Sequence, residues 1–169
     1  MWAFTPEAKD NAIAAPWFED ARADFAPYYS STKNIKSAMS EVAEEMVKLG
    51  AFITSFQPGK FTVNKRTRLG YVIEFMLNGA MGRIQIAGLP MFSPTEPKEK
   101  RVRVQCLLNV KDWLKAAVTM QVFSPDTSPL IPYLLVSGAD GHQYTVADLV
   151  MRRGEVPMLA APTISVEQA

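Results

Sequence analysis

The sequence predicts an α+β domain with an α-β-β-β-α core, in which two amphipathic helices flank an antiparallel three-stranded sheet. Three observations lead to this fold class: an apolar stripe with helical spacing over residues 33–49, three strand-like segments between residues 52 and 89, and a longer helical stripe over residues 97–122. The 169 residues suffice for one full core and are too few for two domains of ordinary size. We expect an N-terminal arm at 1–30, a single domain at 31–154 and a C-terminal tail at 155–169.

Aromatic residues and prolines crowd the first 30 residues, and the charges between them allow one short helix around residues 17–25. We interpret this segment as an arm that lies either on its own domain or on a neighbouring subunit. Aromatic side chains are frequent anchors of protein interfaces. The candidate partner-binding residues are therefore Trp2, Phe4, Trp17, Phe18, Tyr28 and Tyr29.

The first helix is expected from Lys33 to Leu49. Ser31 or Thr32 can cap its start, and Gly50 stands where a left-handed C-terminal cap belongs. Apolar residues recur at spacings of four and three, which predicts a half-buried helix. They are Ile35, Met39, Val42, Met46 and Leu49.

Three strands are expected at 52–57, 71–78 and 82–89. Asn78-Gly79 is a strong turn signal, although we expect the loop to continue through Ala80 and Met81 and so to exceed two residues. Residues 59–68 form either a basic loop or an extra hairpin arm. If both helices cover one face of the sheet, the other face presents a mixed set of side chains, which are Phe52, Thr54, Phe56, Arg83 and Gln85.

Residues 101–106 alternate like a strand, but a wider window favours a helix. Apolar residues from Val102 to Met120 recur every three or four positions, and the segment 93–97 supplies cap and first-turn residues. We therefore predict one helix over 97–122, with Cys106 buried on its apolar stripe. A C-terminal helical extension follows, with an apolar segment at 130–136, a turn at 139–141 and a short helix capped by Thr145 and closed by Gly154.

The composition excludes several classes of protein. An apolar fraction of 48% and a charged fraction of 21% are typical of globular domains, and the net charge of +1 gives no global attraction to polyanions or membranes. A single cysteine, Cys106, disfavours a disulfide-stapled secreted scaffold. The N-terminus lacks the features of a signal peptide, and no apolar run approaches the roughly 18 residues of a membrane span. We expect a cytoplasmic protein without membrane contact.

Motifs for catalysis are missing. One histidine and one cysteine cannot make the usual zinc site. Glu41, Glu44 and Glu45 are acidic candidates for a metal, but on a half-buried helix they more simply form a solvated face. His142 follows Asp140-Gly141, as expected for an exposed loop histidine. Neither a G-x-S-x-G nucleophile motif nor a glycine-rich phosphate loop occurs. We expect no enzyme activity, no cofactor and no metal.

Cations crowd the 60–68 connection and the first turns of the second helix. A sheet with aromatics and flanking cations suits single-stranded nucleic acid, because bases stack on rings at about 1–3 kcal/mol each while cations hold phosphates. Phe61 or Phe56 would provide the stacking. The alternative is that these basic runs are solvated and the arm covers the aromatics. The candidate nucleic-acid-binding residues are Lys60, Phe61, Lys65, Arg66, Arg68, Arg83, Lys100, Arg101 and Arg103.

Several motifs between residues 33 and 153 occur together. They are Arg101-Val102, Val110-Lys111-Asp112-Trp113-Leu114-Lys115-Ala116, Ile131-Pro132-Tyr133-Leu134, Asp140-Gly141 and the hairpin from Val72 to Pro90. With them the chain resembles an uncharacterised family of bacteriophage and integrated-element proteins. The resemblance implies a phage or mobile-element context and carries no established activity.

The order helix, three strands, helix is also similar to the double-stranded-RNA-binding domain. That family's second helix opens with a lysine-rich segment, to which Lys98-Glu99-Lys100-Arg101 corresponds approximately. The extension through Tyr133 departs from the pattern. The similarity concerns topology rather than function.

These observations favour a nucleic-acid-binding accessory protein of phage or mobile-element replication or recombination, with single-stranded DNA as the first ligand to test. The alternative is a non-catalytic assembly subunit, a homo-oligomer or a partner-bound protein, anchored by the aromatics of residues 1–30. A third hypothesis, an enzyme with an acidic metal site at Glu41 or Glu44, ranks well below both. The choice between DNA and RNA, any sequence preference and the oligomeric state stay open.

Overall fold

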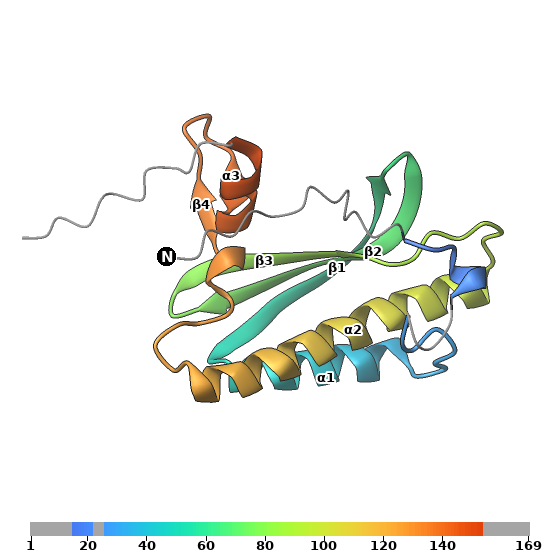
Figure 1. Cartoon of the computed structure of the whole chain (residues 1–169), viewed down its shortest axis with the longest axis horizontal. Helices are drawn as coiled ribbons and strands as arrows, with labels where there is room; N and C mark the ends of the chain where they lie inside the picture. Colours follow the sequence, from blue (N-terminus) through green and yellow to red (C-terminus); the bar gives the residue numbers. More distant parts are fainter. Residues whose placement is uncertain (1–14, 22–25, 154–169) are drawn as a thin grey trace, which may run out of the picture.

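Two helices cover one face of a three-stranded antiparallel sheet in the computed structural model, which describes residues 15–21 and 26–153 (Figure 1). The expected α+β class and α-β-β-β-α order are confirmed. The elements are η1 (Phe18–Asp20), α1 (Ile35–Lys48), β1 (Ala51–Val63), β2 (Arg66–Leu77), β3 (Ala80–Ala87), α2 (Glu96–Phe123), η2 (Ile131–Tyr133), β4 (Leu135–Ser137), β5 (Gln143–Thr145) and α3 (Val146–Arg153).

The first helix has a different N-cap from the expected one. Asn34, rather than Ser31 or Thr32, adopts the extended cap conformation, and its side-chain oxygen accepts a hydrogen bond from the Lys36 backbone N–H at 2.7 Å. Asparagine is as good a cap as serine, so the sequence offered three acceptable residues within four positions. At the other end Gly50 has φ +78°, which confirms the left-handed cap.

Both hairpins of the sheet close with two-residue turns. Asn78 and Gly79 have φ values of +48° and +81°, as a type I′ turn requires, and Leu77 pairs directly with Ala80. The expectation of a longer loop was wrong, because Ala80 and Met81 already belong to β3. Residues 59–68 form the extra hairpin arm rather than a loop, turning at Asn64 and Lys65.

A stabilising substitution follows from the tip of this arm. Lys65 holds φ +61° at the second position of its turn, a conformation that costs a non-glycine residue about 1–2 kcal/mol. Lys65→Gly should therefore raise the free energy of unfolding by about 1 kcal/mol, measured by urea denaturation. Thr67→Gly, on the adjoining strand, should lower it. An unchanged or lower stability for Lys65→Gly would contradict the turn geometry.

The core lies between the inner face of the sheet and both helices. Ile73 and Phe75 of β2 and Leu107 of α2 are fully buried. Residues 104–108 of α2 are all buried, even though they occupy every side of the helix. The N-terminal segment covers the side that faces away from the sheet, where the Gln105 amide donates to the Pro27 carbonyl at 3.0 Å. This cover explains why the periodicity of residues 101–106 is weak.

Cys106 of α2 is buried in the core, as expected, and is a free thiol. Burial raises the pKa of Cys106 to about 12, although the nearby guanidinium groups of Arg68 and Arg103 act in the opposite direction. A thiol with so high a pKa has almost no thiolate at neutral pH and is a poor nucleophile. The group therefore acts as a packing residue.

The described part of the N-terminal arm packs on its own domain. Phe18 is buried against Leu69 and Val102, and its backbone N–H donates to the Pro90 carbonyl at 2.8 Å. The Tyr28 hydroxyl donates to Asp112 Oδ2 at 2.7 Å. The helix expected around 17–25 is limited to one 3₁₀ turn at Phe18–Asp20 within the described residues. Trp2 and Phe4 lie outside the described residues.

The C-terminal extension contains a small hairpin in addition to the expected helix. Strands β4 and β5 pair with each other, and Leu134 forms a single bridge to Gly82 of β3. Thr145 caps α3 as expected, since its hydroxyl accepts from the Asp148 N–H at 3.1 Å. In Figure 1, β4 and α3 lie on the side of the sheet opposite α1 and α2. No helix in the described part of the chain is long and apolar enough to cross a membrane.

Candidate nucleic-acid interface

One end of the molecule gathers cations from three elements. Helices α1 and α2 run in the same direction, and both begin at the end where the β1–β2 hairpin has its tip (Figure 1). Two hollows lie at this end. Helices α1 and α2 line one of them, and the β1–β2 hairpin and α2 line the other. We call this region the basic end; its cations are Lys33, Lys36, Lys60, Lys65, Arg66, Lys98, Lys100 and Arg101.

The smaller hollow, which we call the Trp17 pocket, combines an aromatic ring with cations. It has a volume of about 330 Å³, and Trp17, Lys60, Lys65 and Arg66 line it, with Glu99 of α2 on its border. The Arg66 guanidinium lies 4.2 Å from the centre of the Trp17 ring, in a cation–π arrangement. Lys60 and Lys65 have no ion-pair partner among the described residues.

A second aromatic ring lies beside this pocket, although it does not line it. Phe92 meets Trp17 edge to face at a centroid distance of 5.7 Å and is 77% exposed. Its ring is therefore accessible to a ligand that enters the pocket. Sequence reasoning missed Phe92, because its segment joins β3 to α2 and carries no pattern that places it near Trp17.

Glu19 fixes the segment that carries Phe92. Its carboxylate accepts backbone hydrogen bonds from Phe92 and Ser93, both at 3.1 Å, and an ion pair from Lys98 at 3.1 Å. Partial burial acts to raise the pKa of Glu19, but these hydrogen bonds outweigh it and lower the pKa to about 2. The charge of Lys98 is thereby balanced by that of Glu19. At neutral pH the ionised carboxylate also holds the backbone that carries Phe92.

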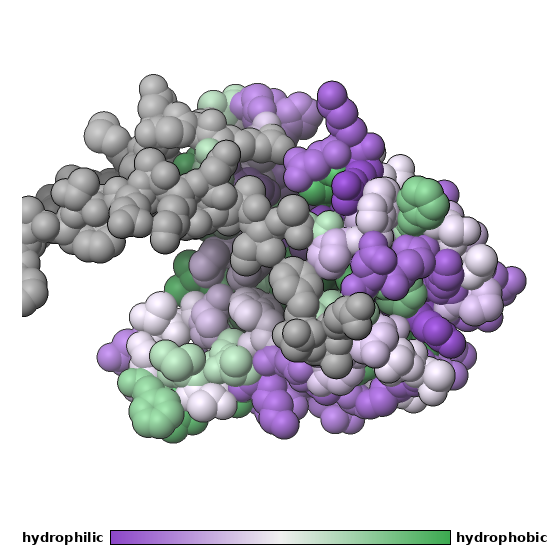
Figure 2. Space-filling model, turned by 45° about the vertical axis from the view of Figure 1, so that its right-hand side comes forward, coloured by the Kyte–Doolittle hydropathy of each residue, from purple (hydrophilic) through white to green (hydrophobic). Residues whose placement is uncertain are grey.

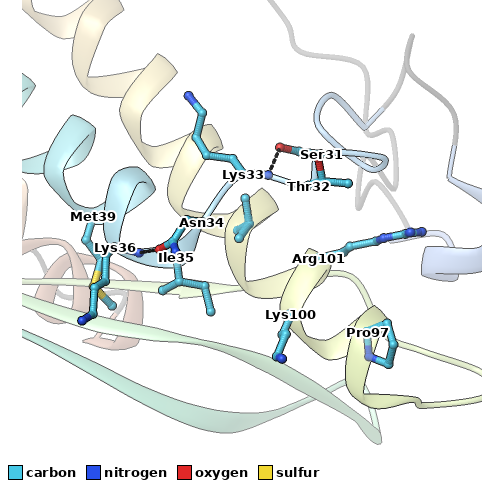
Figure 3. Close-up of a pocket in the computed structure, with 11 residues that line it drawn as sticks. Ser31, Thr32, Lys33, Asn34, Ile35, Lys36, Met39, Pro97, Lys100 and Arg101 are labelled. Atoms are coloured by element: carbon cyan, nitrogen blue, oxygen red, sulfur yellow. Dashed lines mark hydrogen bonds between the residues drawn. The ribbon is translucent and has the colours of Figure 1, made fainter.

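The larger hollow is a groove of about 800 Å³ between the beginnings of α1 and α2 (Figure 3). Its lining is mainly apolar, from Ile35, Met39 and Val104, and four cations surround it. Lys33 pairs with Glu41, and Lys100 pairs with Glu96 at 3.4 Å. Lys36 and Arg101 have no ion-pair partner in the described ranges. Sequence reasoning missed Lys33 and Lys36, since nothing local placed them beside α2.

Three of the predicted cations are engaged inside the fold. Arg68 donates from Nε to the Gly88 carbonyl at 2.5 Å and from Nη2 to the Ala87 carbonyl at 2.9 Å. Arg103 donates to the Gly70 carbonyl at 3.0 Å and lies over the Tyr71 ring. The third, Arg83, pairs across the strands with Glu74 at 3.3 Å. None of the three lines the Trp17 pocket or the groove.

The outer face of the sheet differs from the expected binding surface. Phe56 packs against the core on the helix side, so it is not on that face. Phe52 is 59% exposed there, beside Met76 and Met81 in the register of the strands. Phe61 is half-buried and does not line the Trp17 pocket. With Arg83 paired to Glu74, this face offers apolar side chains rather than cations.

Two of the three acidic candidates on α1, Glu41 and Glu45, are paired with cations. Glu41 contacts Lys33 and lies 3.6 Å from Lys111, and the hydrogen bond from Lys33 is the main cause of its lowered pKa. Glu45 pairs with Lys48 at 2.7 Å. Within the described residues no three histidine, cysteine or acidic side chains lie close enough together to hold a metal ion. His142 is exposed in the β4–β5 turn, as expected.

No protein-family model matches the chain, and no match was found among curated proteins or solved structures. The resemblance to phage and integrated-element proteins therefore stays a prediction.

Proposed function

We propose that the protein binds single-stranded nucleic acid, with DNA as the first ligand, at the basic end of the fold. The observation that carries this proposal is the Trp17 pocket, in which an aromatic ring and three cations line a hollow of about 330 Å³. That volume is at the lower limit of small-ligand pockets, which suits one nucleotide. An accessory role in phage or mobile-element replication or recombination extends the proposal and rests on the resemblance alone.

The chemistry of the pocket matches both parts of a nucleotide. A base can stack on the exposed Phe92 ring beside Trp17, and such stacking contributes about 1–3 kcal/mol per base. The adjacent phosphates can be held by Lys60, Lys65 and Arg66, which lie on the two strands of one hairpin arm. Bases in a duplex already have both faces covered by their neighbours, so stacking on a protein ring favours a single strand over a duplex.

The test is a fluorescence anisotropy titration with a labelled twelve-residue oligothymidylate, a mixed-sequence strand and its duplex, over a series of salt concentrations. We expect single strands to bind more tightly than the duplex, with affinity that falls steeply as salt rises. Lys60→Gln with Lys65→Gln should weaken binding by about tenfold or more and lower the salt slope by about 1.4.

A matched control removes the same charge elsewhere. Lys48→Gln with Lys115→Gln replaces two exposed lysines outside both hollows, and it should change affinity by no more than about twofold. Equal losses for the two double variants would mean that only net charge matters. Absence of any binding at low salt would rule out the proposal.

The second candidate, an assembly subunit, is favoured by a different surface from the expected arm. Of the predicted anchors, Phe18 is buried and Tyr28 is hydrogen-bonded within the domain. Hydrophobic residues gather instead at the lower left of Figure 2, where α2 ends, and Val122 and Phe123 are 75% and 80% exposed. A stable oligomer in light scattering that Phe123→Asp dissociates, and that salt leaves intact, would favour this candidate.

A further inference from the structure

The Trp17 pocket and the α1–α2 groove lie on either side of the beginning of α2. Pro94 and Glu99 line the pocket, while Pro97, Lys100 and Arg101 line the groove. At about 100° per residue, Glu99 lies about 200° around the helix from Pro97, so a helix diameter of about 10 Å separates the two hollows. A chain that leaves one of them must cross the first turn of α2 to enter the other.

The groove offers the two kinds of contact that a nucleotide chain needs. Its floor is apolar, from Ile35, Met39 and Val104, and can contact the faces of bases or sugars. Its rim carries cations on both sides. Figure 3 shows the ammonium groups of Lys36 on α1 and Lys100 on α2 directed to one side, whereas the Arg101 guanidinium is directed away from both. Apolar contact flanked by cations is the pattern of sites that follow a single strand.

One cation of the groove is unfavourably placed without a ligand. The N-terminal end of a helix carries a partial positive charge, which repels cations within its first turn. Lys36 lies in the first turn of α1, whereas Lys100 and Arg101 lie in the second turn of α2, whose first turn carries Glu96 and Glu99. Among the four cations of the groove, Lys33 and Lys100 have carboxylate partners within the described residues, Glu41 and Glu96. A polyanion in the groove would offset the repulsion at Lys36 and pair with Arg101.

We propose that a single strand held at the Trp17 pocket continues across the first turn of α2 into the α1–α2 groove, where Lys36 and Arg101 hold its next phosphates. This inference rests on the proposed function and adds the path of the strand. It assigns a role to two residues outside the pocket, Lys36 and Arg101. The sequence predicted Arg101 as a binding residue but not Lys36. It also predicts that affinity depends on strand length.

The experiment compares labelled oligothymidylates of three and twelve residues, titrated at low salt against the wild type and the variant Lys36→Gln with Arg101→Gln. Both side chains are exposed and have no ion-pair partner in the described part of the chain, so the fold should tolerate their loss. Thermal unfolding followed by circular dichroism checks this. We expect equal affinity for the trimer and at least about tenfold weaker binding of the longer strand by the variant.

The outcomes separate the path from the function on which it rests. If the variant binds both lengths as the wild type does, while Lys60→Gln with Lys65→Gln loses binding, the path is wrong and the proposed function stands. If the groove variant loses trimer and longer strand equally, the groove is the primary site, and the order of the path is wrong. If the wild type binds neither strand at low salt, both proposals fail. The double variant Lys48→Gln with Lys115→Gln controls for net charge.

Discussion

Gly70→Ala should lower the free energy of unfolding by about 3 kcal/mol or more, the largest single-residue effect that we expect in this protein. A Cβ atom at this position of β2 would lie 1.9 Å from the carbonyl oxygen of Ile86 on β3. The obstacle is backbone, so no rotamer change can relieve the contact. Strand β3 would have to move, and the pairing of Gly70 with Ala87 would be lost.

The register of the sheet supplies a control for this substitution. Gly59 of β1 lies directly opposite Gly70, and a Cβ there would meet nothing within 4 Å. Gly59→Ala should therefore leave stability unchanged or raise it slightly, since alanine reduces the entropy of the unfolded chain. Urea denaturation of the two variants measures the difference. Equal stabilities would show that β3 does not approach Gly70 as closely as described.

Arg68→Met should cost about 2–3 kcal/mol of stability, whereas Arg66→Met should cost about 1 kcal/mol at most. The Arg68 guanidinium donates to the carbonyls of Ala87, the last residue of β3, and of Gly88, and its loss leaves these partly buried acceptors unpaired. Methionine keeps the aliphatic stem, so the comparison isolates the charged group. Arg66 contributes a cation–π contact with Trp17 and one exposed hydrogen bond to the Ala15 carbonyl at 3.4 Å.

The same two variants should show the reverse order in nucleic-acid binding. Arg66→Met removes a cation from the Trp17 pocket and should weaken binding of a single strand by about tenfold. Arg68→Met, assayed at a temperature where it is folded, should bind within about threefold of the wild type, because Arg68 lines neither hollow. Loss of binding in Arg68→Met without loss of stability would mean that the backbone hydrogen bonds of Arg68 are not its main role.

Local patterns were sufficient to predict the order of the main helices and strands, but not the β4–β5 hairpin. The apolar stripes of α1 and α2, Gly50 after the first helix and Asn78-Gly79 between strands each depend on neighbours a few residues away. The errors arose in two situations. In one, several neighbouring residues could have filled the same position; in the other, a residue type that is rare at a position occupies it. Asn34 capped α1 in place of Ser31, and Lys65 closed a turn at a position that usually needs glycine.

The candidate site was predictable only in part. The sequence marked cations at 60–66 and 100–101, and these lie at the basic end. It gave no reason to separate Arg66 from Arg68, which lie two positions apart on one strand. Their partners differ: the Trp17 ring for Arg66, and the carbonyls at the end of β3 for Arg68. Those partners come from segments far away in the chain, and only packing brings them close.

Hydrophobic periodicity and turn chemistry act over a few residues, so they sufficed to predict the α-β-β-β-α order, the amphipathic faces and the burial of Cys106. Long-range packing, by contrast, settles which cations bind groups within the fold and which are available to a ligand. It also brought Trp17, Phe92 and the β1–β2 tip to one place, and aligned the beginnings of both helices beside them. The role of a charged side chain depends on the groups that folding places within a few ångströms of it. Apolar periodicity, in contrast, depends only on residues nearby in the sequence.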